Sequence, residues 1–114
     1  MSADNSNTSS NSPPAYHRIV VKAGTSVLAG GTGGVDGAVM TALVDQMARL
    51  RQEGQEVLLV TSGAVAAGRQ ALGQPKDRLD VPFRQMLAAV GQSLLMHTYE
   101  ELFGRHHVLV AQAL

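Results

Sequence analysis

The sequence predicts an α/β fold with a mainly parallel sheet, because strand-like runs alternate with helical patterns along the chain. Two continuous apolar runs, 19–21 (IVV) and 56–61 (EVLLVT), are typical of strands covered on both faces. Between them, apolar residues recur at spacings of three and four, the period of a helix. The expected order, β-α-β-α-α-β, favours parallel strands joined by right-handed crossovers.

The first half of the chain divides into a tail, a strand, a loop and a helix. Residues 1–16 begin with a Ser/Asn-rich stretch, and we expect a disordered tail there. The stretch from Gly24 to Gly37 holds half of the chain's 12 glycines and is expected to be a loop. Helical spacing starts after Asp36, a suitable N-cap, and Gly54 suits the position that ends this helix.

The second half begins with the strand 56–61, which leads directly into small residues, 62–68 (SGAVAAG). These suit a tight turn into a closely packed helix. Pro82 is placed to start the next helix, which Gly104 ends. Within that helix, Tyr99 and Phe103 stand four residues apart and are best explained by core packing. The last residues, 107–114 (HVLVAQAL), predict a third strand.

Composition excludes several classes of site and partner. The chain has 114 residues, no net charge and no cysteine, so disulfides, thiolate metal sites and cysteine nucleophiles are excluded. Balanced charge gives no reason to expect nucleic acid or an anionic membrane as a partner. No apolar run approaches the roughly 18 residues of a membrane span, and residues 1–14 resemble neither a secretory signal nor a mitochondrial presequence. We therefore expect a cytoplasmic protein.

A first candidate site follows the first strand, at Lys22-Ala23-Gly24-Thr25-Ser26. In open parallel sheets, ligands bind beyond the carboxyl ends of the strands. The Lys22 ammonium, the two hydroxyls and backbone N–H groups beside a glycine suit a phosphate group. Taken alone, the segment is explained as well by a solvated lysine followed by a glycine turn.

A second candidate site follows the second strand, at Thr61-Ser62-Gly63-Ala64. Free N–H groups at a helix N-terminus attract a carboxylate or a phosphate. The simpler interpretation is that Ser62 is an ordinary N-cap and that the small residues allow close packing. Two anion-suited turns at neighbouring strand ends would face one another, so the pair favours an anion-binding α/β enzyme.

Other motifs give no site. The glycine loop, 30–37, matches neither the dinucleotide-binding pattern G-x-G-x-x-G nor a P-loop, and its simplest role is a flexible loop or a flap over a substrate. His97 and the pair His106-His107 lack metal-ligand spacing with acidic partners, so no metal site is expected. Glu100-Glu101 lies late on a helix and is explained by a solvated face.

Four segments, taken together, resemble the opening of the glutamate 5-kinases, a family with the amino-acid kinase fold. In order they are IVVKAGTSVLAGG, VLLVTSGAVAAGRQALG, QMLAAVGQSLLMHTYEELF and VLVAQAL. The combination of KAGTS, TSGAVAAG and AAVGQS separates the chain from aspartate, acetylglutamate, carbamate and uridylate kinases. The resemblance implies that residues 17–114 are the N-terminal part of a three-layer sandwich domain with a mainly parallel sheet, truncated at its C-terminus.

The implied reaction is ATP-dependent phosphorylation of the side-chain carboxylate of L-glutamate, which starts proline biosynthesis. Lys22 would contact the ATP phosphates and stabilise the charge of the transferring group, and Mg²⁺ would accompany ATP. The phosphate loop would be shaped by Gly24, Thr25 and Ser26. The glutamate substrate would be held by Ser62 with the backbone of Gly63 and Ala64. Proline as a feedback inhibitor and a homo-oligomer at full length are further expectations.

The resemblance has limits that leave alternatives open. Ala23 stands where the family commonly has a larger aliphatic residue. The family's later aspartate, asparagine and lysine motifs would lie beyond Leu114, so we expect the 114-residue chain by itself to have no kinase activity. The kinase half of the bifunctional pyrroline-5-carboxylate synthetase carries similar motifs. A non-catalytic kinase-derived module is the other alternative, although packing alone requires neither Lys22 nor Ser62.

Overall fold

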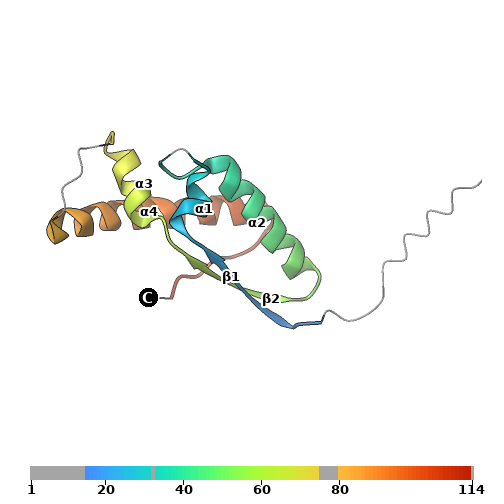
Figure 1. The fold of residues 1–114 in the computed structure, drawn as a ribbon. Helices are drawn as coiled ribbons and strands as arrows, with labels where there is room; N and C mark the ends of the chain where they lie inside the picture. The colour runs from blue at the N-terminus through green and yellow to red at the C-terminus, as the bar shows by residue number, and fades with distance from the viewer. Residues whose placement is uncertain (1–14, 32, 75–79, 114) are drawn as a thin grey trace, which may run out of the picture.

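The computed structural model describes residues 15–31, 33–74 and 80–113. The predicted tail, 1–16, lies almost entirely outside these residues. Within them, two strands and four helices alternate along the chain (Figure 1). Their bounds are β1 Arg18–Ala23, α1 Thr25–Ala29, α2 Gly37–Gln52, β2 Glu56–Thr61, α3 Ala64–Ala71 and α4 Val81–Gly104. The predicted α/β class is confirmed.

Strands β1 and β2 form a parallel two-stranded sheet, as predicted. The register places Arg18 opposite Glu56 at one end and Ala23 opposite Thr61 at the other. Both strands therefore finish at the same edge of the sheet. Helices α1 and α2 form the connection between the strands, and α2 contacts β2.

One face of the sheet is covered by helices α2 and α4. Side chains from β1, α1, α2 and α4 meet there in a single apolar core. Its buried members are Ala23, Leu28, Met40, Val44, Met47, Leu95, Tyr99 and Leu102. On the opposite face, Val20, Leu58 and Val60 are 60%, 55% and 50% exposed. The continuous apolar runs led us to expect that both faces of the sheet would be covered. Among the described residues, only one face is covered.

Helix α2 begins and ends where the sequence predicts. The Asp36 carboxylate accepts hydrogen bonds from the N–H groups of Ala38 at 2.8 Å and Val39 at 3.4 Å. These are donors that no helical carbonyl can satisfy, so Asp36 stabilises the first turn. Beyond the other end, Gly54 adopts a left-handed backbone with φ of +91°. This conformation is the usual one for the residue that follows a helix.

The stretch from Gly24 to Gly37 is not wholly a loop, which corrects the prediction. Residues Thr25–Ala29 form the short helix α1, and Leu28 on that helix is completely buried. Gly30, with φ of +53°, ends the helix in the left-handed region. A five-residue helix is too short to show a helical period in the sequence, and the many glycines of the stretch favoured a loop. Burial of Leu28 in the core stabilises this turn, and that burial is a tertiary contact.

The predicted third strand is also wrong within the described residues. Residues 108–113 form no strand, and Leu109 is 96% exposed. Leu114 lies outside the description. An apolar run can indicate strand propensity, but a strand exists only where another backbone offers hydrogen bonds in register. The pattern of residues does not say whether such a partner lies alongside.

Helices α3 and α4 cross in unusually close contact at two glycines. A Cβ atom on Gly91 would overlap the carbonyl oxygen of Ala64, and one on Gly68 would overlap that of Leu87. Only glycine lets the two backbones approach this closely. The predicted close packing of the 62–68 segment is therefore confirmed, and it fixes the start of α3 against α4.

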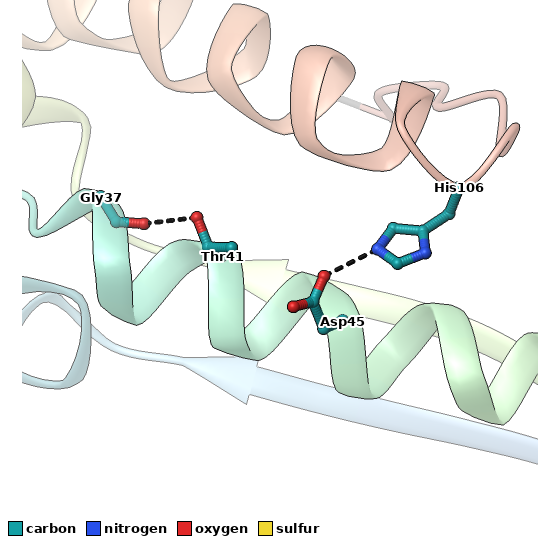
Figure 2. A network of polar contacts seen from close by, with 4 residues as sticks. All are labelled: Gly37, Thr41, Asp45 and His106. Atoms are coloured by element: carbon teal, nitrogen blue, oxygen red, sulfur yellow. Dashed lines mark hydrogen bonds and ion pairs between the residues drawn. The ribbon is translucent and has the colours of Figure 1, made fainter.

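The end of α4 is tied to α2 by a polar contact. His106 follows α4, and its Nε2 atom lies 2.7 Å from the Asp45 carboxylate on α2 (Figure 2). In the same view, the Thr41 hydroxyl donates to the Gly37 carbonyl at 2.8 Å within the first turn of α2.

None of the described helices is long and apolar enough to cross a membrane.

Candidate functional site

The two turns that the sequence singled out lie side by side at the carboxyl edge of the sheet. Ala23 and Thr61 are opposite one another in the register, and the next N–H, that of Ser62, donates to the Ala23 carbonyl at 2.8 Å. This bond joins the first turn to the second. The structure thus brings the segments 22–26 and 61–64 together, as their positions after parallel strands led us to expect.

The first turn is open on the side that a ligand would approach. Gly24 has an extended backbone and precedes α1, and no atom would lie within 4 Å of a Cβ placed on it. The side chains of Lys22, Thr25 and Ser26 are exposed. Across the described part of the chain, the Lys22 side chain has no ion-pair or hydrogen-bond partner. An exposed ammonium group two residues before an open turn suits an anion of several oxygens, such as a phosphate.

Ala23 holds the first turn to the core. Its side chain is buried in the core, while Lys22, the preceding residue, points to the opposite, exposed face of the sheet. This alternation follows from the two-residue period of a strand. The sheet therefore holds the Lys22 backbone rigidly and leaves the ammonium end free to move.

The second turn depends on an unusual backbone at Gly63. Its φ is +108° and ψ is −1°, a conformation that side chains other than hydrogen disfavour. A Cβ there would also come within 3.2 Å of Cδ1 of Leu28 on α1. Gly63 is the N-cap of α3, with no side-chain cap. The simpler interpretation of Ser62 as an N-cap is therefore wrong, and the exposed Ser62 hydroxyl has no capping role.

Behind the second turn lies a hydrogen-bonded pair that sequence reasoning missed. The Tyr99 hydroxyl on α4 lies 2.8 Å from the Thr61 hydroxyl, which in turn donates to the Ser62 carbonyl at 3.0 Å. Burial raises the pKa of Tyr99, and the Thr61 hydroxyl, which can turn to donate to the phenolate, offsets part of that rise. The available signal was a tyrosine at a core position, because a buried phenol needs a partner.

The glycine loop lies beside the second turn. The Val35 N–H donates to the Gln70 side-chain oxygen on α3 at 3.1 Å, and a Val35 methyl would lie 3.8 Å from a Cβ on Gly63. An open cavity of about 260 Å³ lies between this loop, the start of α2, and helices α3 and α4. It is lined mainly by apolar side chains, among them Val35, Met40, Leu94 and Leu95. The role of the loop as a flap stays a prediction.

Acidic and histidine side chains on α4 face solvent. His97 and Glu101, one helical turn apart, form an exposed ion-pair contact of 3.1 Å. Glu100 is exposed as well, so the solvated-face interpretation of Glu100-Glu101 is confirmed. In the described ranges, no group of three or more histidine, aspartate or glutamate side chains is arranged to hold a metal ion.

Comparison with known proteins gives a family and close relatives. Residues 17–114 match the model of the amino acid kinase family. The chain is 52% identical over 99 residues to a protein named glutamate 5-kinase from Dehalococcoides mccartyi strain 195, covering 87% of this chain and 26% of that protein. A glutamate 5-kinase from Herpetosiphon aurantiacus is 55% identical over 99 residues, with 87% and 27% covered. The one from Geobacter sp. strain M21 is 53% identical over 97 residues, with 85% and 26% covered. The chain thus spans about a quarter of the length of these relatives.

Proposed function

Because the chain belongs to the amino acid kinase family, we propose that it supplies two substrate-binding turns of a glutamate 5-kinase. The complete enzyme would transfer the γ-phosphoryl group of ATP to the side-chain carboxylate of L-glutamate. The products would be γ-glutamyl phosphate and ADP, and the reaction would open proline biosynthesis. Three relatives that are 52–55% identical to this chain over 97–99 aligned residues carry this name.

The observation that carries the proposal is the contact between the two turns. Ser62 N–H donates to the Ala23 carbonyl at 2.8 Å, so an anion on the first turn and an anion on the second would be neighbours. Transfer between two bound groups is fast when both are held in line at short distance, and this alignment can account for several orders of magnitude in rate. A rigid pair of parallel strands is well suited to hold them.

Lys22 is proposed to bind and stabilise the transferring phosphoryl group. Its side chain is exposed, stands two residues before the open Gly24 turn and is without a partner among the residues described. Charge builds on the phosphoryl oxygens during transfer, and a nearby cation lowers the barrier. Mg²⁺ bound with ATP would supply further neutralising charge. The hydroxyls of Thr25 and Ser26 are exposed at the same turn and complete the phosphate-binding set.

The second turn is proposed to hold the glutamate. The Ser62 hydroxyl is exposed, and the Gly63 and Ala64 N–H groups lie at the start of α3. These donors suit a carboxylate. The attacking carboxylate of glutamate is already ionised at neutral pH, because its reference pKa is about 4.3. Catalysis by this chain's residues therefore consists of binding, alignment and charge stabilisation, with no general base.

Contacts from outside this chain are needed as well. Since the chain covers 26% of the Dehalococcoides relative, we expect no phosphotransfer from residues 1–114 alone. A cytoplasmic location, proline as a feedback inhibitor and homo-oligomeric assembly stay predictions. The kinase half of a bifunctional pyrroline-5-carboxylate synthetase would use the same two turns, and a reductase activity in the complete protein would identify it.

The direct test is formation of glutamyl hydroxamate from ATP, Mg²⁺, L-glutamate and hydroxylamine by the complete protein that carries this chain. We expect product with L-glutamate and none with L-aspartate or N-acetyl-L-glutamate, which related kinases phosphorylate. Phosphorylation of either of those in place of L-glutamate would overturn the proposed substrate. Absence of product with all three would favour a non-catalytic module.

A further inference from the structure

The side chains of Tyr99 and Thr61 and the carbonyl of Ser62 form a hydrogen-bonded series from the core to the second turn. The Tyr99 ring is 1% exposed and lies on α4, beneath the sheet edge. Its hydroxyl is 2.8 Å from the Thr61 hydroxyl at the end of β2. The Thr61 hydroxyl is 3.0 Å from the carbonyl of Ser62. Of these three groups, only the Ser62 carbonyl belongs to a residue that is proposed to bind substrate.

The direction of these bonds follows from counting hydrogens. A carbonyl oxygen can only accept, so the single hydrogen of the Thr61 hydroxyl is donated to Ser62. The same hydroxyl must then accept from Tyr99, whose own hydrogen is thereby used. A phenylalanine in place of Tyr99 would leave the Thr61 oxygen without its donor in a part-buried position, where an unmade bond is costly.

Fixing the Ser62 carbonyl also fixes the N–H of Gly63. The two groups belong to one trans peptide plane, in which C=O and N–H point in opposite directions. With the carbonyl held toward Thr61, the Gly63 N–H is held pointing away from it. That N–H makes no backbone hydrogen bond within the described ranges. Backbone bonds hold both neighbours of this plane, from the Ser62 N–H to Ala23 and from the Ala67 N–H to the Gly63 carbonyl. Glycine still lets the plane tilt more easily than another residue would, and the bond from Thr61 restrains that tilt.

We propose that Tyr99 is a positioning residue, which acts through Thr61 and the Ser62 carbonyl to aim the Gly63 N–H at the carboxylate of the bound substrate. This inference rests on the proposed function of the second turn. The Tyr99 hydroxyl, and not only its ring, then contributes to binding of L-glutamate. It assigns a function to a core residue whose packing role would be served equally well by phenylalanine.

The ring and the hydroxyl of Tyr99 can be separated by matched variants. Tyr99→Phe and Thr61→Val each remove one hydroxyl and keep the volume of the side chain. Phe103→Leu disturbs the ring that packs on Tyr99, with centroids 6.4 Å apart, and leaves the hydrogen bonds in place. Thr98→Val removes a neighbouring hydroxyl that, among the described residues, bonds only to its own helix, at the Leu94 carbonyl.

The experiment measures kcat and KM for L-glutamate in the complete protein, with hydrogen–deuterium exchange of the peptide that contains residues 60–66. For Tyr99→Phe and Thr61→Val we expect KM for L-glutamate to rise about 5- to 30-fold, the usual effect of one lost hydrogen bond, with kcat within about 2-fold. The double variant should be no worse than the poorer single one, because both break the same hydrogen-bonded series. Exchange in 60–66 should be faster in these variants and unchanged in Thr98→Val.

Unchanged KM and unchanged exchange in Tyr99→Phe would overturn the inference and leave the proposed function intact. Equal losses in Tyr99→Phe and Phe103→Leu would also overturn it, since packing alone would then explain the effect. If the unaltered protein fails to phosphorylate glutamate, the proposed function falls and takes the glutamate-binding role of Tyr99 with it. In that case exchange still decides whether Tyr99 restrains the turn.

Discussion

Ser62 and Ala23 are joined by a backbone hydrogen bond of 2.8 Å that extends the parallel ladder one step past the ends of β1 and β2. Because of this bond, the two turns that follow the strands begin at a fixed distance from each other. A shift of one turn would move the other. Each variant is considered in the complete protein that carries this chain.

Lys22→Ala should lower kcat about 100- to 1000-fold, because a positioned charge on the transferring group is lost. Stability should be unchanged, since the Lys22 side chain is exposed. The matched control is Arg18→Ala, which removes a cation from the same face at the other end of β1. Arg18 pairs with Glu56 at 2.8 Å in an exposed contact worth little. Equal activity of Lys22→Ala and the unaltered protein would remove Lys22 from the mechanism.

Gly63→Ala should cost about 1–2 kcal/mol of stability, because a left-handed backbone is strained for alanine. The added methyl would also press on Leu28 at 3.2 Å and displace the turn, so KM for L-glutamate should rise. Gly54→Ala gives a control, since φ there is +91° and no atom lies within 4 Å. Urea unfolding should show a loss in both variants. A glutamate KM that is equal in the two would contradict a role for the second turn.

Gly91→Ala should destabilise the protein by about 1–3 kcal/mol, the range for forcing extra volume into a packed contact. The methyl would overlap the Ala64 carbonyl and push α3 away from α4. Gly104→Ala, at the end of the same helix and in open space, should be neutral or stabilising by about 0.5–1 kcal/mol. Thermal unfolding compares them. Similar melting temperatures for the two variants would show that the helices do not need this glycine.

Stability should depend on Tyr99 ionisation at high pH. Its pKa is raised by burial, so the unfolded chain loses this proton first as pH rises above about 10, its ordinary value. The folded state then binds more protons than the unfolded state, and stability falls with increasing pH. The melting-temperature difference between the unaltered protein and Tyr99→Phe should be constant from pH 7 to 9 and shift against the unaltered protein above pH 10. A difference that stays constant to pH 11 would show that Tyr99 ionises equally in both states.

The contact between His106 and Asp45 should couple the end of α4 to α2. Its 2.7 Å bond is partly exposed, so a double-mutant cycle with His106→Ala and Asp45→Ala should give about 0.5 kcal/mol. Urea unfolding at neutral pH measures each corner of the cycle. A coupling energy of zero would mean that the core holds α2 and α4 together without it.

Sequence patterns alone were enough for the parallel strands, the capped helix α2 and the two candidate turns. The signals are local: Asp36 caps because its side chain reaches N–H groups two and three residues on, and β1 and β2 are recognisable from runs of apolar residues. The family resemblance suggested the substrates and the roles that are proposed for Lys22 and Ser62, and the match over residues 17–114 shows the family.

Tertiary structure decided what depends on contacts between segments far apart in the sequence. Helix α1 exists because Leu28 is buried in a core built from other elements. Residues 108–113 are not a strand because no backbone among the described residues pairs with them. The hydrogen bond between Tyr99 and Thr61 joins residues 38 positions apart, and no periodic pattern in the sequence predicts it. A sequence determines which groups a residue can offer, and only the folded chain determines which partner each group meets.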